Sequence, residues 1–288
     1  MARAVPEMVA ARGRAPLDRI RARLPADLAP HAPRRYERIG EVVLLKLGAE
    51  LGPRRREIAA AFADVLEAKT VLADYGVQGP WREPAVEVLF GDGTETVHLE
   101  DGVRFKLDAA RIMFSSGNLA ERIRMWRTVR PSETVVDLFA GIGYFALPMA
   151  VHGRPARVVA CEVNPTAFAY LEENVRLNRA WCVEPRLGDC RQTAPQEVAD
   201  RIVMGYLDGE AYLDVAMAAA KDVAILHYHE STPVEEVPHG PWSRVENAAR
   251  RADCRAELLA VHRIKSYAPR IRHVVLDVRL SRPNGPAR

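Results

Sequence analysis

The sequence predicts an α/β protein in which a doubly wound, Rossmann-like sheet ends in an antiparallel hairpin and follows a small α+β domain. From residue 134 onward, short apolar runs alternate with helix-like segments, which is typical of βαβ units around a parallel sheet. The last two apolar runs have no helix of convincing length between them, so they should pair as a hairpin. A glycine-rich turn directly after the first run indicates a sharp passage from strand to helix.

The expected strands follow in chain order. The parallel strands are expected at residues 134–139, 157–162, 184–187, 201–206 and 223–228. The closing hairpin is expected at residues 256–266 and 273–280. These elements assign residues 131–288 to one doubly wound domain.

The region before residue 131 has a different pattern. Residues 1–30, rich in Ala, Arg and Pro, indicate a basic arm, and residues 31–113 a small α+β domain. Pro53 should open a helix that runs to about Lys69, and Gly91-Asp92-Gly93 predicts a hairpin turn. Residues 114–130 should form a linker helix that begins with a loop and N-cap at residues 115–118. Strands are expected at residues 41–47, 70–75, 85–90, 94–99 and 103–107.

Composition narrows the class of protein. A net charge of +3 over 288 residues does not by itself demand a polyanionic partner. The four cysteines have no C-x-x-C spacing, which favours reduced thiols. No apolar run is long enough to span a bilayer, and the first residues lack the apolar stretch of a signal peptide. We therefore expect a cytoplasmic protein.

The strongest chemical signal is D-L-F-A-G-I-G at residues 137–143, where a buried strand passes into a helix. Glycine lets the backbone approach a ligand at such a turn, although a ligand-free corner would also use it. Glu162 ends the next strand about 20 residues later, where an acid can accept hydrogen bonds from both ribose hydroxyls. Together these two features predict a nucleoside site.

A third element strengthens that prediction. Asp189 follows the next short strand, where its carboxylate can accept a hydrogen bond from an adenine amino group. Dinucleotide-binding dehydrogenases need a third glycine, and Ala146 stands there instead. The pattern therefore favours a mononucleoside cofactor over a pyrophosphate.

These runs, with E-V-N-P-T-A at 162–167, G-D-C-R at 188–191 and H-Y-H-E at 227–230, resemble the archaeal-type tRNA enzymes that modify position 37 beside the anticodon. The resemblance extends from about Tyr36 to Leu280. It implies a class I methyltransferase fold, S-adenosylmethionine as cofactor and tRNA as partner. The cofactor-binding residues that it implies are Ser115, Asn118, Arg122, Asp137, Phe139, Gly141, Gly143, Glu162, Val163, Asn164, Gly188, Asp189, Cys190, Met204, Gly205 and Tyr206.

Two branches of that family differ in the group that they transfer. The guanosine N1-methyltransferases read F-S-P-R in the linker and N-L-P after the fourth strand, whereas this chain has Gly117 and Gly205 in place of the Arg and the Asn. The chain is thus similar to the wybutosine-pathway branch, which transfers a 3-amino-3-carboxypropyl group and releases methylthioadenosine. Ser115, Asn118 and Arg122 are then candidate donors to the carboxylate of the transferred arm, although Arg122 could instead pair with an acid.

The remaining polar residues allow several roles. Glu121, Asp208 and His229 are candidate bases for the acceptor's proton. His227 and His229 alternate on one strand, but no third ligand is apparent, so no metal is expected. Basic residues that could contact tRNA phosphates are Arg34, Arg35, Arg54, Arg55, Arg56, Lys265, Arg270 and Arg272.

The leading hypothesis is aminocarboxypropyl transfer from S-adenosylmethionine to a modified guanosine at position 37 of tRNA. The alternatives are methyl transfer to a tRNA guanosine, aminocarboxypropyl transfer to a peptide or small metabolite, and a catalytically silent cofactor-binding RNA chaperone.

Overall fold

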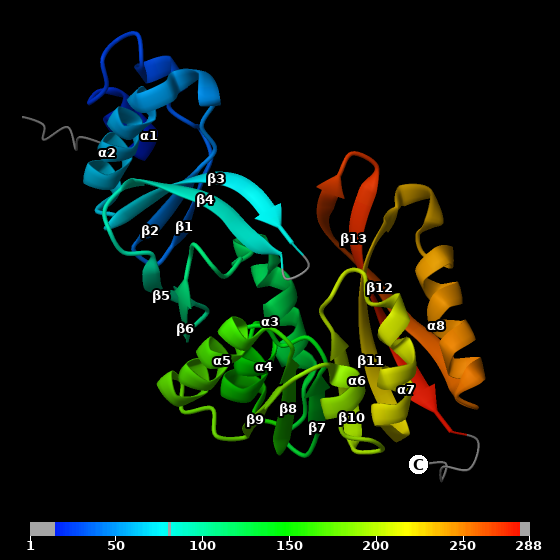
Figure 1. Cartoon of the computed structure of the whole chain (residues 1–288). Coiled ribbons are helices and arrows are strands. Elements are labelled where there is room, and N and C mark those ends of the chain that lie inside the picture. Colours follow the sequence, from blue (N-terminus) through cyan, green and yellow to red (C-terminus); the bar gives the residue numbers. More distant parts are fainter. Residues whose placement is uncertain (1–14, 80–81, 283–288) are drawn as a thin grey trace, which may run out of the picture. The chain divides into compact units, whose positions relative to one another are not determined.

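A computed structural model describes residues 15–79 and 82–282 (Figure 1). The chain forms two compact units that divide between Thr96 and Val97, and each unit has a hydrophobic core of its own. Within the described residues, no helix combines the length and the apolar character needed to cross a bilayer.

The N-terminal unit is a four-stranded sheet, ordered β1-β2-β3-β4, covered by helix α2. Ile58, Phe62 and Leu66 recur every four residues along α2 and are buried against the strands, as an amphipathic helix requires. The helix ends where Glu67 adopts a left-handed backbone with φ of 53°. The elements are α1 (Pro16–Arg21), η1 (Ala29–His31), β1 (Tyr36–Ile39), β2 (Val42–Leu45), η2 (Ala49–Arg54), α2 (Arg55–Leu66), β3 (Thr70–Gln78) and β4 (Glu83–Phe90).

Residues 15–30 belong to this unit and do not form a separate arm. Ile20 of α1 and Leu28 are fully buried in the same core as α2. The prediction of a basic arm over residues 1–30 is therefore wrong for residues 15–30, whereas residues 1–14 lie outside the described residues. Isolated apolar residues in an Ala-, Arg- and Pro-rich stretch have no periodicity that would mark them as core.

The hairpin predicted at Gly91-Asp92-Gly93 is also wrong. Strand β4 pairs with β3, whereas β5 (Glu95–Glu100) pairs with β6 (Val103–Asp108). The turn from β5 to β6 is Asp101-Gly102, with φ of 46° and 77°. Positive φ at both central residues is what a two-residue hairpin needs, and Asp-Gly supplies it.

The first unit ends earlier than residue 113, where the sequence placed its boundary. The backbone N–H groups of Arg104 and Lys106 in β6 donate to the side-chain oxygens of Asn178 and Asn174, at 2.8 and 2.6 Å. Both asparagines lie at the end of α5, so long-range bonds join β6 to the C-terminal unit. Such bonds leave no local pattern in the sequence.

The C-terminal unit is a seven-stranded sheet in the order β12-β13-β11-β10-β7-β8-β9. Strands β11, β10, β7, β8 and β9 run parallel, while β13 is antiparallel to both β11 and β12. The expected doubly wound sheet and its closing hairpin are confirmed. The strands are β7 (Thr134–Asp137), β8 (Arg157–Glu162), β9 (Val183–Leu187), β10 (Ala199–Met204), β11 (Ala220–Pro233), β12 (Arg255–Ala268) and β13 (Ile271–Ser281).

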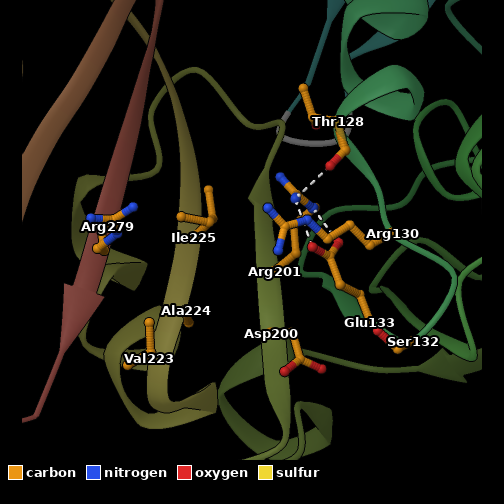
Figure 2. A pocket seen from close by; sticks show the side chains of 10 residues that line it. All are labelled: Thr128, Arg130, Ser132, Glu133, Asp200, Arg201, Val223, Ala224, Ile225 and Arg279. Carbon is orange, nitrogen blue, oxygen red and sulfur yellow. Dashed lines mark hydrogen bonds and ion pairs between the residues drawn. The ribbon is translucent and has the colours of Figure 1, made fainter. Parts of the chain in front are cut away.

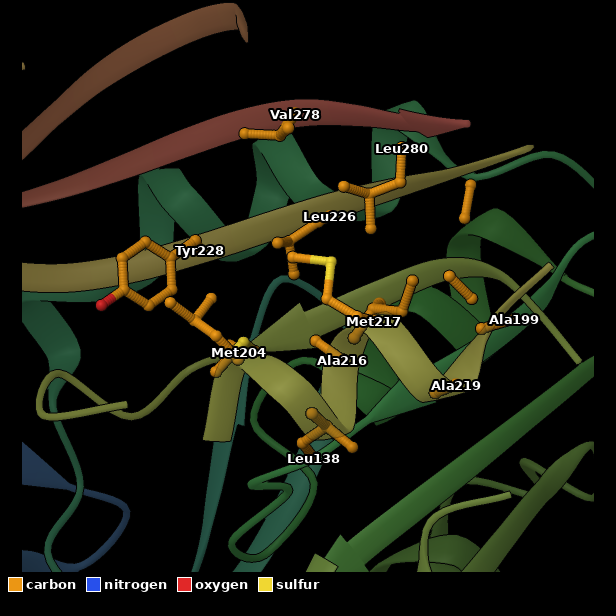
Figure 3. Close-up of a cluster of buried hydrophobic side chains, with 14 of the residues drawn as sticks. Leu138, Ala199, Met204, Ala216, Met217, Ala219, Leu226, Tyr228, Val278 and Leu280 are labelled. Carbon is orange, nitrogen blue, oxygen red and sulfur yellow. The ribbon is translucent and has the colours of Figure 1, made fainter. Parts of the chain in front are cut away.

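One face of this sheet packs against α7 and α8 in an apolar core (Figure 3). Leu226 and Tyr228 of β11 and Val278 and Leu280 of β13 point into that core. The helices and helical turns are η3 (Ser116–Asn118), α3 (Leu119–Thr128), α4 (Ala146–Pro148), η4 (Met149–Gly153), α5 (Pro165–Leu177), α6 (Cys190–Thr193), η5 (Glu210–Tyr212), α7 (Leu213–Ala219), η6 (Val234–Glu236) and α8 (His239–Arg251).

The opposite face of the same strands is polar. Successive side chains of a strand point to opposite faces, so His227, His229, His273 and Asp277 share the face that is turned away from the apolar core. Helix α3 lies on that face, because its Arg124 bonds to Asp277. The sheet therefore presents buried polar groups beside the linker segment.

Candidate active site

The glycine turn lies where β7 ends. Gly141 and Gly143 have φ of 58° and 102°, which side chains rarely adopt. A Cβ at Gly141 would also lie 2.5 Å from the Tyr144 ring, and one at Gly143 would lie 2.5 Å from Leu147. Both glycines are thus required by conformation and by space.

Glu162 ties the end of β8 to this turn. Its carboxylate oxygens accept hydrogen bonds from the backbone N–H groups of Gly141 and Asn164, each at 2.7 Å. Burial raises the pKa of Glu162, while these bonds act to lower it. Val163 is half exposed, and the Asn164 side chain caps α5. The structure therefore places the predicted ribose acceptor against the glycine turn.

Asp137 has the clearest unmet hydrogen-bonding need at the turn. It is fully buried, and its Oδ1 accepts from the Phe139 backbone N–H at 3.2 Å. Its Oδ2 is buried and has no hydrogen-bond partner among the described residues. Burial raises the pKa of Asp137 to about 7. A buried carboxylate oxygen of this kind calls for a donor, such as a hydroxyl or ammonium group of a ligand.

The segment after β9 is arranged differently from the prediction. Asp189 caps α6 through the Arg191 backbone N–H at 2.9 Å and also forms an ion pair with the Arg191 side chain. These contacts lower the pKa of Asp189, the side-chain bond to Arg191 most of all. Gly188 precedes it with φ of 133°, and the Cys190 side chain lies in the apolar core. Burial raises the pKa of Cys190 to about 12, so it stays a neutral thiol.

The start of the linker, residues 114–118, lies near the glycine turn, because the Tyr144 hydroxyl donates to the carbonyl of Met113, the residue directly before the linker. Asn118 occupies the N-cap position of α3, within the segment where the cap was expected, but its side chain makes no capping bond. Its Oδ1 is buried without a hydrogen-bond partner in the described part of the chain. Ser115 Oγ accepts a hydrogen bond from Lys265 Nζ at 2.8 Å.

Arg122 is already engaged by an acid. Its guanidinium makes a bidentate ion pair with Glu100, at 2.6 and 2.7 Å, and both side chains are buried. It also donates to the Ser115 carbonyl at 3.0 Å. The structure thus matches the alternative interpretation of Arg122 as a structural partner, and its assignment to the cofactor carboxylate needs correction. The Glu100 partner comes from β5, 22 residues earlier, which no motif indicated.

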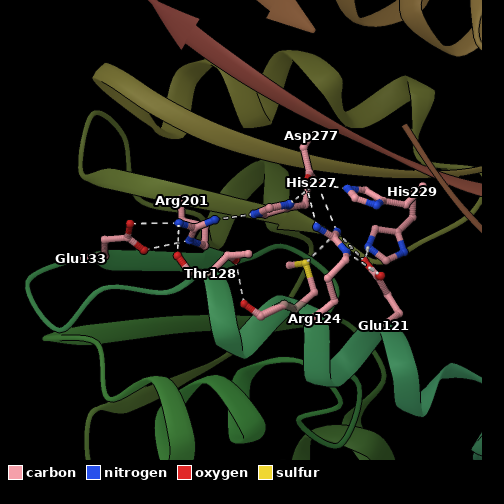
Figure 4. Close-up of polar contacts among 10 residues, drawn as sticks. Glu121, Arg124, Thr128, Glu133, Arg201, His227, His229 and Asp277 are labelled. Atoms are coloured by element: carbon pink, nitrogen blue, oxygen red, sulfur yellow. Dashed lines mark hydrogen bonds and ion pairs between the residues drawn. The ribbon is translucent and has the colours of Figure 1, made fainter. Parts of the chain in front are cut away.

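Two of the three candidate bases, Glu121 and His229, lie together among buried polar groups (Figure 4). Glu121 is buried, and both of its oxygens accept from Arg124, at 2.7 and 2.8 Å. His229 Nε2 lies 3.8 Å from Glu121 Oε1 and is buried without a hydrogen-bond partner among the described groups. Asp208, by contrast, is exposed. The structure therefore brings Glu121 and His229 together but not Asp208.

His229 is held as a neutral ring. Burial, followed by the neighbouring His273, lowers the pKa of His229 well below its ordinary value of 6.5. Its Nδ1 lies 3.1 Å from His273 Nε2, and its ring packs against Phe145 with centroids 5.1 Å apart. A neutral imidazole with an open nitrogen is a proton acceptor.

Asp277 is the shared hydrogen-bond acceptor of three side chains on this polar face. It accepts hydrogen bonds from His227 at 2.6 Å, from Arg124 at 2.7 Å and from His262 at 2.9 Å. Burial acts to raise the pKa of Asp277, but the bonds from His227 and Arg124 hold it well below its usual range. Because Arg201 donates to His227 Nε2, the proton of His227 lies on Nδ1 and points at Asp277.

Three residues of the site, Asp277, Arg124 and His273, were not predicted from the sequence. They come from α3 and β13, elements separated by more than a hundred residues, and nothing in their spacing marks them. No group of three or more His, Cys, Asp or Glu side chains among the described residues could hold a metal ion. His227 instead bonds to Asp277 and Arg201.

Gly205 follows β10 at the same edge of the sheet. A Cβ there would lie 3.0 Å from the Phe145 ring, so the position is closely bounded. Met204 is buried in the apolar core, and the Tyr206 ring lies 5.3 Å from that of Phe139. The carboxyl ends of parallel strands meet at one edge, so these residues lie on the same side of the sheet as the glycine turn.

A separate hollow of about 330 Å³ opens at the opposite end of the parallel strands, where β7 and β10 begin (Figure 2). It lies near the start of β10, where Arg201 bonds to Glu133 and to the Thr128 carbonyl. This hollow is remote from the glycine turn because it adjoins the amino ends of β7 and β10. Its lining residues are Thr128, Arg130, Ser132, Glu133, Asp200, Arg201, Val223, Ala224, Ile225 and Arg279.

Comparison with known proteins agrees with this geometry. A family model described as the TRM5/TYW2 methyltransferase domain matches residues 96–258, and one described as the TYW2 N-terminal domain matches residues 17–94. The tRNA(Phe) (4-demethylwyosine(37)-C(7)) aminocarboxypropyltransferase of Pyrococcus horikoshii is 43% identical over 262 residues, which cover 89% of this chain and 93% of the relative.

Two further relatives match most of the chain. The crystal structure of P. horikoshii TYW2 in complex with MeSAdo has a TM-score of 0.83 and 40% identity, covering 92% of this chain and 99% of that one. The tRNA (guanine(37)-N(1))-methyltransferase Trm5b of Pyrococcus abyssi is 34% identical over 266 residues, 90% of this chain and 78% of the relative. On these matches the chain belongs to the TRM5/TYW2 family.

Proposed function

We propose that this protein transfers the 3-amino-3-carboxypropyl group of S-adenosylmethionine to a modified guanosine at position 37 of tRNA. The observation that carries the proposal is the pair of glycines, Gly117 and Gly205, at positions where the methyl-transferring branch has Arg and Asn. The P. horikoshii relative of the same activity matches nearly the whole chain. Because the proposed acceptor is tRNA, we also propose that the protein is cytoplasmic.

The residues at the glycine turn fit a nucleoside with a charged side arm. Glu162 presents a carboxylate against Gly141, suited to ribose hydroxyls. Asp137 Oδ2 and Asn118 Oδ1 are buried acceptors without partners among the described residues, and the cofactor carries hydroxyl and ammonium donors. Ser115, Phe139, Gly143, Val163, Asn164, Gly188, Asp189, Cys190, Met204 and Tyr206 remain proposed contacts.

The group that reacts is decided by which carbon of the cofactor is aimed at the acceptor. When bound, S-adenosylmethionine supplies a sulfonium with three electrophilic carbons, so little covalent help is needed from the protein. Attack at the arm forms a bond from the acceptor to that carbon, and the electrons of the broken C–S bond stay on sulfur, giving methylthioadenosine. We propose that the arm can take this position because Gly117 and Gly205 carry no side chain that would obstruct it.

A ring-carbon acceptor loses a proton after attack, and we assign its removal to His229. Its Nε2 is buried and has no hydrogen-bond partner within the described chain, and the lowered pKa keeps the ring neutral. Glu121 is a weaker candidate because Arg124 occupies both of its oxygens. Glu121, 3.8 Å from Nε2, would instead stabilise the imidazolium that forms.

We assign fewer basic residues to tRNA phosphates than the sequence indicated. Arg54 pairs with Asp27 and Glu57, and Arg55 with Glu87, so their charges are already offset. Arg270 also donates to the Glu235 carboxylate, and Arg272 donates to the Ser266 hydroxyl. We therefore assign phosphate contacts to Arg34, Arg35 and Arg56, which are exposed.

Product analysis tests the proposal. Purified protein is incubated with S-adenosylmethionine and with tRNA that carries the modified guanosine. We expect methylthioadenosine and a nucleoside heavier by about 101 daltons, because the arm replaces a hydrogen. Release of S-adenosylhomocysteine with a single added methyl group would overturn the proposal in favour of the N1-methyltransferase activity. Release of methylthioadenosine with no gain on tRNA would move the acceptor to a peptide or metabolite.

A further inference from the structure

The rings of His229 and His273 form a buried pair on the polar face of the sheet. His273 of β13 pairs with Ser231 of β11, and His229 precedes Ser231 by two residues, so the two rings are diagonal neighbours on one face. Their centroids are 5.3 Å apart, and His229 Nδ1 lies 3.1 Å from His273 Nε2. His229 and His273 are only 1% and 2% exposed, so the bond between the rings is shielded from water.

The outer nitrogens of this pair distinguish it from the other histidine buried on the same face. Both ring nitrogens of His227 have protein partners, Asp277 and Arg201. His229 Nε2 and His273 Nδ1, in contrast, are buried and have no hydrogen-bond partner among the described residues. Buried polar atoms are normally satisfied, so such a nitrogen calls for an explanation. His229 Nε2 is the nitrogen to which we assign the proton of the acceptor.

The bond between the rings couples the proton positions of the two residues. A neutral imidazole carries one N–H, and the nitrogen that carries it is set by the hydrogen bond that the other nitrogen makes. His229 can accept a proton on Nε2 only while its own proton lies on Nδ1, and that proton then points at His273 Nε2. His273 must in turn be neutral with its proton on Nδ1, because only a bare Nε2 can accept.

The surroundings keep His273 in a state that can accept this bond. Burial, followed by the charge of Lys265 on β12, lowers the pKa of His273 to about 4, so the ring is uncharged at neutral pH. The reverse tautomer would place the proton on His229 Nε2, which lies 3.8 Å from Glu121 Oε1, beyond hydrogen-bond distance. Both Glu121 oxygens accept from Arg124, so the charge that could attract that proton is already offset.

We propose that His273 is a positioning residue that accepts the Nδ1–H of His229 and so keeps Nε2 of His229 bare for the acceptor's proton. This inference rests on the proposed function, in which His229 takes the proton that the acceptor's ring carbon loses. In that step the C–H bond breaks, its electron pair returns to the ring, and the proton binds His229 Nε2. The Nδ1 proton stays on His229, and the imidazolium later releases the added proton to water.

Nitrogen NMR of the full chain, labelled with ¹⁵N-histidine, tests the tautomer, because bare and protonated imidazole nitrogens differ widely in chemical shift. His229→Gln identifies the signals of His229 by their loss. In the unmodified protein at neutral pH, we expect the proton of His229 on Nδ1 and a bare Nε2. His273→Leu removes the acceptor and should move that proton to Nε2 in most molecules. His273→Gln offers an amide oxygen in place of the ring nitrogen and should keep the proton on Nδ1.

Kinetics of product formation on tRNA give a second readout. We expect His273→Leu to lower kcat by about 10- to 100-fold, the range for leaving a buried polar group without its partner, and to leave the KM for tRNA unchanged. His273→Gln should restore most of the rate. Val274→Ala is the matched control, because Val274 adjoins His273 on β13 but lies in the apolar core on the opposite face, so both the tautomer and kcat should be preserved.

Three results would overturn the inference. The first is a proton on Nε2 of His229 in the unmodified protein. The second is a proton that stays on Nδ1, or a normal kcat, in His273→Leu. The third is an equal loss of kcat in the leucine and glutamine variants, which would make His273 structural. The tautomer is read without turnover, whereas product mass decides which group is transferred, so a failure of the inference can be told apart from a failure of the proposed function.

Discussion

Replacing Gly205 by asparagine should block aminocarboxypropyl transfer while leaving the cofactor bound. Gly205 has no positive φ, so a side chain adds volume without backbone strain. Its Cβ would lie 3.0 and 3.3 Å from two atoms of the Phe145 ring, so that ring must shift by a few tenths of an ångström. Gly205→Ala should displace the Phe145 ring by well below 1 Å. We therefore expect it to lower the rate of transfer by less than about tenfold.

Asparagine adds three more heavy atoms to the same space. Phe145 is 7% exposed and packs on His229, so its displacement carries over to the proposed base. A misplacement near 1 Å costs about 100-fold, or about 2.7 kcal/mol of barrier, and we expect this loss in kcat for Gly205→Asn.

Single-turnover formation of methylthioadenosine measures the rate, and calorimetry measures S-adenosylmethionine affinity. Gly93→Asn is the control, because a Cβ at Gly93 has no neighbour within 4 Å. The reasoning is refuted if Gly205→Asn keeps the normal rate, or if cofactor affinity falls by the same factor as the rate.

Further predictions concern the cofactor, stability and RNA. Glu162→Ala should weaken S-adenosylmethionine binding by about 1.5–3 kcal/mol per charged hydrogen bond lost, and unchanged affinity by calorimetry would remove the ribose assignment. Arg122→Met should lower the free energy of unfolding by about 3–5 kcal/mol in urea titration, because it leaves a buried carboxylate unpaired; a neutral effect would contradict the ion pair. Since the pKa of Asp137 is raised from 3.8 to about 7, its contribution to stability is lost as the pH rises toward 7, and Asp137→Asn should flatten that decline. Arg34→Glu with Arg35→Glu should reduce the salt dependence of tRNA binding by roughly 0.7–0.9 per phosphate contact, and an unchanged slope would exclude both residues.

Local patterns determined most of the C-terminal fold. The strand predicted at residues 157–162 coincides with β8, because a short apolar run between turn residues has few other conformations available. The glycine turn and Glu162 were identified from spacing alone, since both lie at fixed positions at the ends of neighbouring parallel strands. The final hairpin followed from the lack of a helix between two strands.

Contacts between distant segments decided the rest. Which turn closes the hairpin depended on strand pairing, so Asp101-Gly102 forms it and Gly91-Asp92-Gly93 does not. The partner of Arg122 lies on another element, and only the folded chain shows that Glu100 occupies the guanidinium. A charged side chain has the same local sequence whether it binds a ligand or an internal acid.

The polar face of the sheet also depends on contacts between segments that are distant in the sequence. His229 could be named from its strand, but its neutral state depends on burial and on His273, 44 residues later. Lys265 reaches Ser115 across 150 residues of sequence. The sequence alone determined the cofactor class, because that information lies in short motifs. Tertiary structure decided which charges face the cofactor, because desolvation and pairing depend on neighbours that the chain supplies only when folded.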